Sequence, residues 1–296
     1  MRERPFPEVP GVAVEHRFVE ARGLRFHVAS AGPADGEPLV LLHGWPQHWF
    51  CWRKVLPALA ERHRVLMPDL SGLGWSDAPA FGYEKESLAD DVLALLDRLG
   101  LPRVRLLAHD WGAWVSFLIA LREPERIERY VALNIVPPWQ GERRDPLAAL
   151  AIWRLWYQVV LASPLGARVA ASEQLMARAM RGDNVQPDAF SDADLAQFTA
   201  ALAEPARARA SVQIYRSFLL RELPGLLRGR YDAVALRVPT LLLFGEHDGA
   251  ISTAQVLASQ RAGDTLEIEL VAGSGHFIAE EQPELVAARA LAWLAA

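Results

Sequence analysis

The stretch that decides the fold is Val104-Arg105-Leu106-Leu107-Ala108-His109-Asp110-Trp111-Gly112. It opens with a short apolar run, which is typical of a parallel strand that is covered on both faces. Two small residues, Ala108 and Gly112, then flank Asp110. A tight turn from strand to helix that exposes one nucleophilic side chain needs small residues at these two places. We therefore predict that Asp110 stands at the apex of a strand–turn–helix elbow.

Further apolar runs lie on both sides of this stretch, at residues 39–42, 65–67, 130–133, 240–244 and 266–270. Residues 14–19 and 24–28 are typical of an antiparallel pair. A helical pattern begins near Ser87, the expected N-cap, and stops at Gly100. This alternation predicts the α/β class, with a doubly wound and mostly parallel sheet. In such a sheet, ligands bind beyond the carboxyl ends of the strands.

The alternation is interrupted in the second half of the chain. From Trp139 to about Arg230 no strand run occurs, and aromatic residues recur at helical spacing. We therefore expect an inserted helical cap. The predicted division is residues 1–138 for the first part of the core, 139–230 for the cap and 231–296 for the second part of the core.

Composition limits the classes of partner. The chain has 296 residues, of which 51% are hydrophobic and 23% charged, with a net charge of −5. The acidic balance argues against a nucleic-acid partner. The single cysteine, Cys51, allows no internal disulfide, and neither a signal peptide nor an apolar run of about 20 residues is visible. We expect a cytoplasmic protein without a membrane span, and the oligomeric state stays open, with a homodimer as one option.

The residues at the strand ends indicate covalent hydrolysis. The carboxylate of Asp110 is ionised at neutral pH and needs no base in order to attack. It suits displacement at a saturated carbon, which produces an ester. His276 is expected to activate the water that cleaves this ester, and Asp248 to orient His276. Glu246 is the alternative acid, and the other position where an acid is known to lie, after the strand at residues 130–133, holds Asn134.

Two backbone donors and two structural histidines complete the predicted site. An oxyanion hole needs two N–H groups, and those of Trp45 and Trp111 are the natural pair. His43 and His109 are predicted to support neighbouring loops. We expect no cofactor and no metal ion.

These motifs resemble the epoxide hydrolases of the α/β-hydrolase fold. The resemblance rests on His43-Gly44-Trp45-Pro46-Gln47, Trp52-Arg53, the run from Asp69 to Asp77, His109-Asp110-Trp111-Gly112 and Gly275-His276-Phe277. It covers the whole predicted core and is specific for members with an aspartate nucleophile. Haloalkane dehalogenases and fluoroacetate dehalogenases share that nucleophile, so the core leaves the reaction open.

The resemblance implies that two cap tyrosines protonate the opening epoxide oxygen. The segment Ile214-Tyr215-Arg216 resembles the one that carries the first of them, so Tyr215 is the candidate. In one register Trp153 occupies the second position, and Tyr157, one helical turn later, is the replacement. We also expect Trp153, Trp156 and Phe277 to line the substrate pocket.

Three other classes of protein compete with an epoxide hydrolase. A haloalkane dehalogenase needs two N–H donors for the halide, which Trp111 and an indole at Trp45, Trp153 or Trp156 would supply. Fluoroacetate dehalogenases carry arginines just after the nucleophile, where this chain has tryptophans. An inactive ligand-binding protein would not need the complete Asp–His–Asp set. We therefore predict a cofactor-independent hydrolase that converts a small apolar epoxide and water to a diol.

Overall fold

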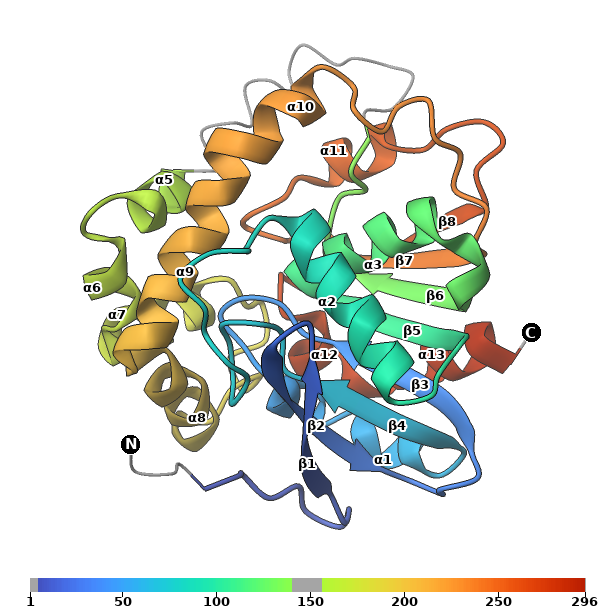
Figure 1. The fold of residues 1–296 in the computed structure, drawn as a ribbon, viewed down its shortest axis with the longest axis horizontal. Coiled ribbons are helices and arrows are strands. Elements are labelled where there is room, and N and C mark those ends of the chain that lie inside the picture. Colours follow the sequence, from blue (N-terminus) through green and yellow to red (C-terminus); the bar gives the residue numbers. More distant parts are fainter. Residues whose placement is uncertain (1–4, 140–155, 296) are drawn as a thin grey trace.

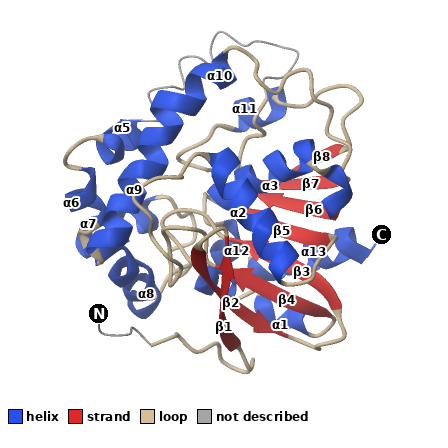
Figure 2. Cartoon of the chain, viewed as in Figure 1, coloured by secondary structure: helices blue, strands red, loops and turns tan. Residues whose placement is uncertain are grey.

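An eight-stranded sheet forms the centre of the molecule in the computed structural model, which describes residues 5–139 and 156–295 (Figures 1 and 2). The strand order is β1-β2-β4-β3-β5-β6-β7-β8. The strands are β1 Glu15–Ala21, β2 Leu24–Ala31, β3 Glu37–Leu42, β4 His63–Pro68, β5 Val104–His109, β6 Ile127–Leu133, β7 Thr240–Gly245 and β8 Leu266–Val271. Strand β2 runs antiparallel to β1 and β4, and all other neighbours are parallel. The predicted doubly wound, mostly parallel sheet is confirmed.

Helices cover both faces of the sheet, which explains why its central strands, such as β3 and β7, are largely apolar runs. On one face, Val40 and Leu106 pack with helices α2 (Lys85–Arg98), α3 (Asp110–Arg122) and α11 (Thr253–Ala258). On the other face, Leu39 and Leu107 pack with α1 (Leu56–Ala60), α12 (Ile278–Glu281) and α13 (Pro283–Ala295). Alternate residues of each strand therefore enter two separate hydrophobic layers.

Helix α2 begins three residues before the predicted one, and the expected N-cap at Ser87 is wrong. The cap residue is Glu84, and its side chain makes no capping bond. Instead the backbone N–H of Lys85 donates to Glu222 at 2.7 Å. A carboxylate from a distant segment thus satisfies a donor that the first turn of a helix leaves free. The other end of the helix follows the prediction, because Gly100 adopts the left-handed conformation with φ of 70°.

All described elements between β6 and β7 are helical, as predicted for an insertion. They are α5 Trp156–Ala162, α6 Gly166–Ala170, α7 Glu173–Gly182, α8 Asp192–Ala203, α9 Pro205–Ser217, a π-helical turn Phe218–Glu222 and α10 Leu223–Leu227. Helices α5 to α9 gather at one side of the sheet (Figure 1). Their buried Met180 and Phe198 join the hydrophobic layer of Leu41, so the insertion shares the core of the sheet.

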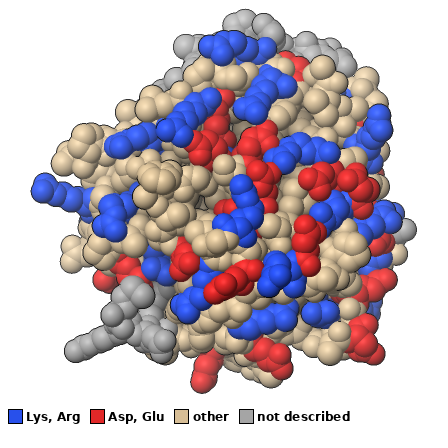
Figure 3. All heavy atoms as spheres, viewed as in Figure 1, with Lys and Arg blue, Asp and Glu red and all other residues tan. Residues whose placement is uncertain are grey.

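The surface carries both signs of charge. On the face drawn in Figure 3, basic and acidic side chains lie interspersed. Helix α2 shows the pattern, because its Glu86 and Asp90 each pair with Arg122 at 2.6 Å. Among the described helices, none combines the length and the apolar character that a membrane span requires.

Candidate active site

Asp110 lies where β5 turns into α3. Its φ of 49° is in the left-handed region, which residues other than glycine rarely adopt. Two glycines make room for this turn. A Cβ at Gly44 would lie 2.2 Å from Asp110 Oδ1, and one at Gly112 would lie 2.3 Å from the carbonyl oxygen of Leu42. The elbow therefore depends on glycine at both positions, and it presents the Asp110 carboxylate beyond the carboxyl end of the sheet.

The predicted oxyanion donors both reach this carboxylate. The backbone N–H of Trp45 donates to Asp110 Oδ1 at 2.9 Å, and the N–H of Trp111 is a second donor. Burial raises the pKa of Asp110, while the positive charge of His276 and these two N–H groups oppose the rise. The two donors therefore lie where they can stabilise negative charge on the Asp110 carboxyl oxygen.

His276 stands between two carboxylates. Its Nε2 is 3.7 Å from Asp110 Oδ2, and its Nδ1 is 2.8 Å from Asp248 Oδ2. Burial lowers the pKa of His276, but the charges of Asp248 and Asp110 outweigh burial and raise this pKa to about 10. Glu246, the alternative acid, is exposed and makes no contact with His276 in the described structure. The structure thus brings Asp110, His276 and Asp248 together.

Asn134 is a site residue to which the sequence reasoning assigned no role. It is buried, follows β6 with φ of 45°, and donates through Nδ2 to Asp248 Oδ2 at 2.8 Å and to the Gly275 carbonyl at 3.0 Å. Burial would raise the pKa of Asp248, but His276 and Asn134 hold it below its usual value. One feature of the sequence could have found it: Asn134 directly follows β6, the other position where the acid of such a site is known to lie.

Two tyrosines from the insertion face the elbow. Tyr157 on α5 and Tyr215 on α9 line one cavity with Asp110 and His276, and their ring centroids are 5.9 Å apart. Burial, together with nearby Asp110, raises the pKa of both phenols, so both are protonated at neutral pH. The remaining candidate, Trp153, lies outside the described residues.

The cavity has a volume of about 600 Å³, a size that suits a small organic molecule. Its lining includes Trp156 and Phe277, two of the three residues expected to line a substrate pocket, together with Trp45, and most of the other lining side chains are apolar. Trp156 is 63% exposed, so it lies at the rim. The indole N–H of Trp45 is already engaged, because it donates to Ser211 at 2.9 Å. In the described residues, no group of three or more His, Cys, Asp or Glu is arranged to hold a metal ion.

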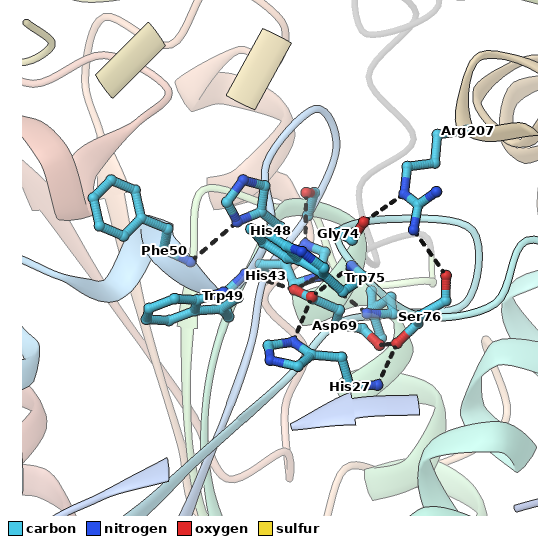
Figure 4. Close-up of polar contacts among 12 residues, drawn as sticks. His27, His43, His48, Trp49, Phe50, Asp69, Gly74, Trp75, Ser76 and Arg207 are labelled. Atoms are coloured by element: carbon cyan, nitrogen blue, oxygen red, sulfur yellow. Dashed lines mark hydrogen bonds and ion pairs between the residues drawn. The ribbon is translucent and has the colours of Figure 1, made fainter. Parts of the chain in front are cut away.

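A buried network around Asp69 supports the loop that carries Trp45 (Figure 4). Asp69 accepts hydrogen bonds from the backbone N–H groups of Trp49 and Trp75 at 2.8 and 2.9 Å, and from His27 at 2.8 Å. Beside it, His43 accepts from the N–H of Leu70 and donates to the carbonyl of Gly44, both at 3.0 Å. His43 therefore supports the loop that carries Trp45.

His109 has a comparable position behind His276. It donates to the backbone carbonyl of His276 at 2.8 Å, and burial lowers its pKa to about 3. A neutral His109 thus fixes the backbone of the His276 loop without adding charge to the site.

Comparison with known proteins agrees with this geometry. The family model described as alpha/beta hydrolase fold matches residues 37–283. The soluble epoxide hydrolase of Corynebacterium sp. (strain C12) is 33% identical over 288 residues, which is 95% of this chain and 98% of that protein. Epoxide hydrolase 2 of Caenorhabditis elegans is 27% identical over 92% of this chain and 77% of its own. The solved structure of the epoxide hydrolase CorEH without ligand aligns with a TM-score of 0.81 at 31% identity, over 96% of this chain and 99% of that one. The chain therefore belongs to the epoxide hydrolase family of the α/β-hydrolase fold.

Proposed function

We propose that the protein converts an apolar epoxide to a vicinal diol through a covalent ester on Asp110. One observation carries the proposal: a carboxylate, a histidine paired with a second carboxylate, and two protonated phenols line one apolar cavity. The proposed cap, residues 139–230, supplies the phenols, and the core supplies the rest.

In the first step an oxygen of Asp110 attacks a ring carbon of the epoxide. The bond between that carbon and the ring oxygen breaks, and Tyr215 or Tyr157 gives its proton to the departing oxygen. The products of this step are a hydroxyalkyl ester and a phenolate. An alkoxide is a poor leaving group, which is why a positioned acid accelerates the step by about 10²–10⁴.

In the second step His276 takes a proton from water, and the hydroxide attacks the carboxyl carbon of Asp110. The N–H groups of Trp45 and Trp111 stabilise the tetrahedral oxyanion. Asp248 stabilises the histidine cation while it exists. Collapse releases the diol, and the proton held by His276 is returned to the phenolate. The sum is one epoxide and one water converted to one diol.

The engaged indole of Trp45 removes one of the indoles that could serve as the second halide donor beside Trp111, and Trp156 remains in the cavity lining. A halide site needs two free N–H donors, and the Trp45 indole donates to Ser211. The two phenols beside Asp110, by contrast, match the need of an alkoxide for a proton.

The test separates the two steps. With His276→Gln, Asp110 still attacks but water is not activated, so intact mass after addition of styrene oxide should show a stable adduct of substrate mass. Asp110→Ala is the control and should form no adduct. Rapid turnover by the histidine variant, or the absence of any adduct, would refute the assigned roles. In heavy-oxygen water, a single turnover of the wild type should place the label in Asp110 and leave the first diol unlabelled.

A further inference from the structure

The cavity contains one carboxylate that the proposed reaction does not use. Asp183 follows α7 and lines the cavity beside His276 and Gly249. Apart from Asp110, Tyr157, Tyr215 and His276, it is the only ionisable side chain among the described residues of the lining. A charged group in an otherwise apolar wall costs free energy unless something compensates it.

The backbone holds Asp183 in this position. Its carbonyl accepts the N–H of His276 at 3.0 Å, and its own N–H donates to Ala179 at 3.2 Å. A Cβ on Gly249 would lie 2.3 Å from Asp183 Oδ1, so the carboxylate lies directly against the backbone of Gly249. This close approach, possible only at a glycine, leaves the carboxylate on the surface of the cavity.

The Asp183 carboxylate has no donor among the described residues. Within residues 5–139 and 156–295, no hydrogen bond or ion pair is made to either of its carboxylate oxygens. Burial raises the pKa of Asp183, and the positive charge of His276 acts in the opposite direction. A carboxylate in the cavity wall that no protein group neutralises favours a ligand that brings a positively charged donor.

The rest of the wall favours a cationic ligand. Trp156, Tyr157 and Phe277 line the same cavity as Asp183. Aromatic faces attract cations, and together with a carboxylate they form the environment that binds ammonium groups. A neutral alkyl group would gain from the aromatic rings but would leave Asp183 without a partner.

We propose that Asp183 receives an ammonium group carried by the substrate, so that cationic epoxides are a preferred substrate class. The inference rests on the proposed function. It refines the expected apolar epoxide to one with a single positive charge away from the ring that opens. Such a substrate also places its charge next to Asp183, which reduces its repulsion of the His276 cation formed during ester hydrolysis.

The test uses two epoxides of the same shape that differ by one charged N–H group, para-(dimethylammoniomethyl)styrene oxide and para-isobutylstyrene oxide. With Asp183→Asn, we expect kcat/KM for the cationic epoxide to fall about tenfold or more, because that is the size of the effect when one contact to a bound cation is lost. Loss of the Asp183 charge also acts on His276, and that effect is shared by both epoxides, so kcat/KM for the neutral epoxide should fall about tenfold less than kcat/KM for the cationic one. Asp183→Glu keeps the charge and should retain part of the preference.

Asp188→Asn is the matched control, because it removes the same charge from an exposed position outside the lining. A second measurement is independent of turnover. In Asp110→Asn, which forms no ester, calorimetry should show that the cationic epoxide binds more tightly than the neutral one. Adding Asp183→Asn should abolish that difference.

The outcomes separate the two proposals. An equal loss of kcat/KM for both epoxides would overturn the inference, since Asp183 would then act only through His276. Equal binding of the two epoxides in Asp110→Asn would overturn it as well. If the wild type turned over neither epoxide but Asp110→Asn bound the cationic one through Asp183, the binding site would stand and the epoxide hydrolase reaction would fail.

Discussion

The ring of Tyr157 meets the ring of Tyr215 edge to face, with centroids 5.9 Å apart and planes at 78°. The two residues are far apart in the sequence, and they meet because α5 packs against α9. Gln158 donates to the Tyr157 hydroxyl at 3.2 Å, which fixes the position of that phenol. The insertion therefore presents two adjacent phenols to the cavity that contains Asp110.

This pairing predicts a non-additive loss of activity. Tyr215→Phe and Tyr157→Phe each remove one hydroxyl and should leave partial epoxide turnover, because the other phenol remains. The double variant should lose about 10²–10⁴ in kcat/KM, which is the usual contribution of a general acid. Rates on styrene oxide for the wild type, both singles and the double give the comparison. Unchanged turnover in the double variant would exclude the phenols as proton donors.

Asn134 should matter for the second step but not for the first. Its hydrogen bond keeps Asp248 ionised and oriented toward His276. Because hydrogen bonds to charged groups contribute about 1.5–3 kcal/mol, Asn134→Ala should slow ester hydrolysis roughly 10- to 100-fold. Rapid-quench single turnovers should show ester formation at the normal rate and slow decay. Equal slowing of both phases would indicate general damage to the fold.

The raised pKa of His276 predicts the pH dependence of ester hydrolysis. His276 must be neutral in order to accept a proton from water, and in the free enzyme its pKa is about 10. Ester formation removes the negative charge of Asp110, so the pKa should fall in the intermediate. The hydrolysis rate should therefore rise with pH and level off below about pH 10. Single-turnover decay of the ester measures this profile, and a rate that is flat or falls with pH would contradict it.

The same pKa predicts how stability depends on pH. His276 has a pKa of about 10 when folded and an ordinary value of 6.5, so the folded state binds the proton more tightly. This stabilisation is fully present below pH 6.5 and is lost as the pH rises toward about 10. Urea unfolding across this range should show a steeper loss of stability in the wild type than in His276→Gln. Identical slopes would mean that His276 has no raised pKa.

Replacing only one member of the Lys85–Glu222 pair should strongly lower the free energy of unfolding. Lys85 is fully buried, and its Nζ lies 3.1 Å from Glu222, 2.8 Å from the carbonyl of Ile214 and 4.4 Å from the ring centroid of Trp111. Lys85→Met leaves the Glu222 charge without its partner and should lower the free energy of unfolding by about 3–5 kcal/mol.

Adding Glu222→Gln to that variant should restore part of the loss. The amide removes the unpaired charge, and its oxygen still accepts the backbone N–H of residue 85 at the start of α2. Urea unfolding of the singles and the double measures the coupling. A double variant as unstable as the sum of the singles would show that the two side chains do not interact.

The sequence by itself determined the sheet, the elbow and the order of the reacting groups. Strands that are buried on both faces must be continuous apolar runs, and the turn at Asp110 requires small neighbours such as Gly112. Both requirements restrict the residue types within a short stretch of chain, so they are visible without coordinates. The candidates Asp110, Asp248 and His276 could be named because each follows a predicted strand, in the order nucleophile, acid, histidine that the α/β-hydrolase arrangement has.

Only the tertiary structure decided which residues, distant in the sequence, contact these groups and the start of α2. Asp248 rather than Glu246 faces His276, Asn134 donates to Asp248, and Glu222 instead of Ser87 satisfies the first turn of α2. Tyr157 reaches Tyr215 because of how α5 lies on α9. Each of these contacts joins segments whose relative position depends on packing between helices and loops. Helical periodicity narrows the faces that can meet, but it does not specify the partner, the register or the distance.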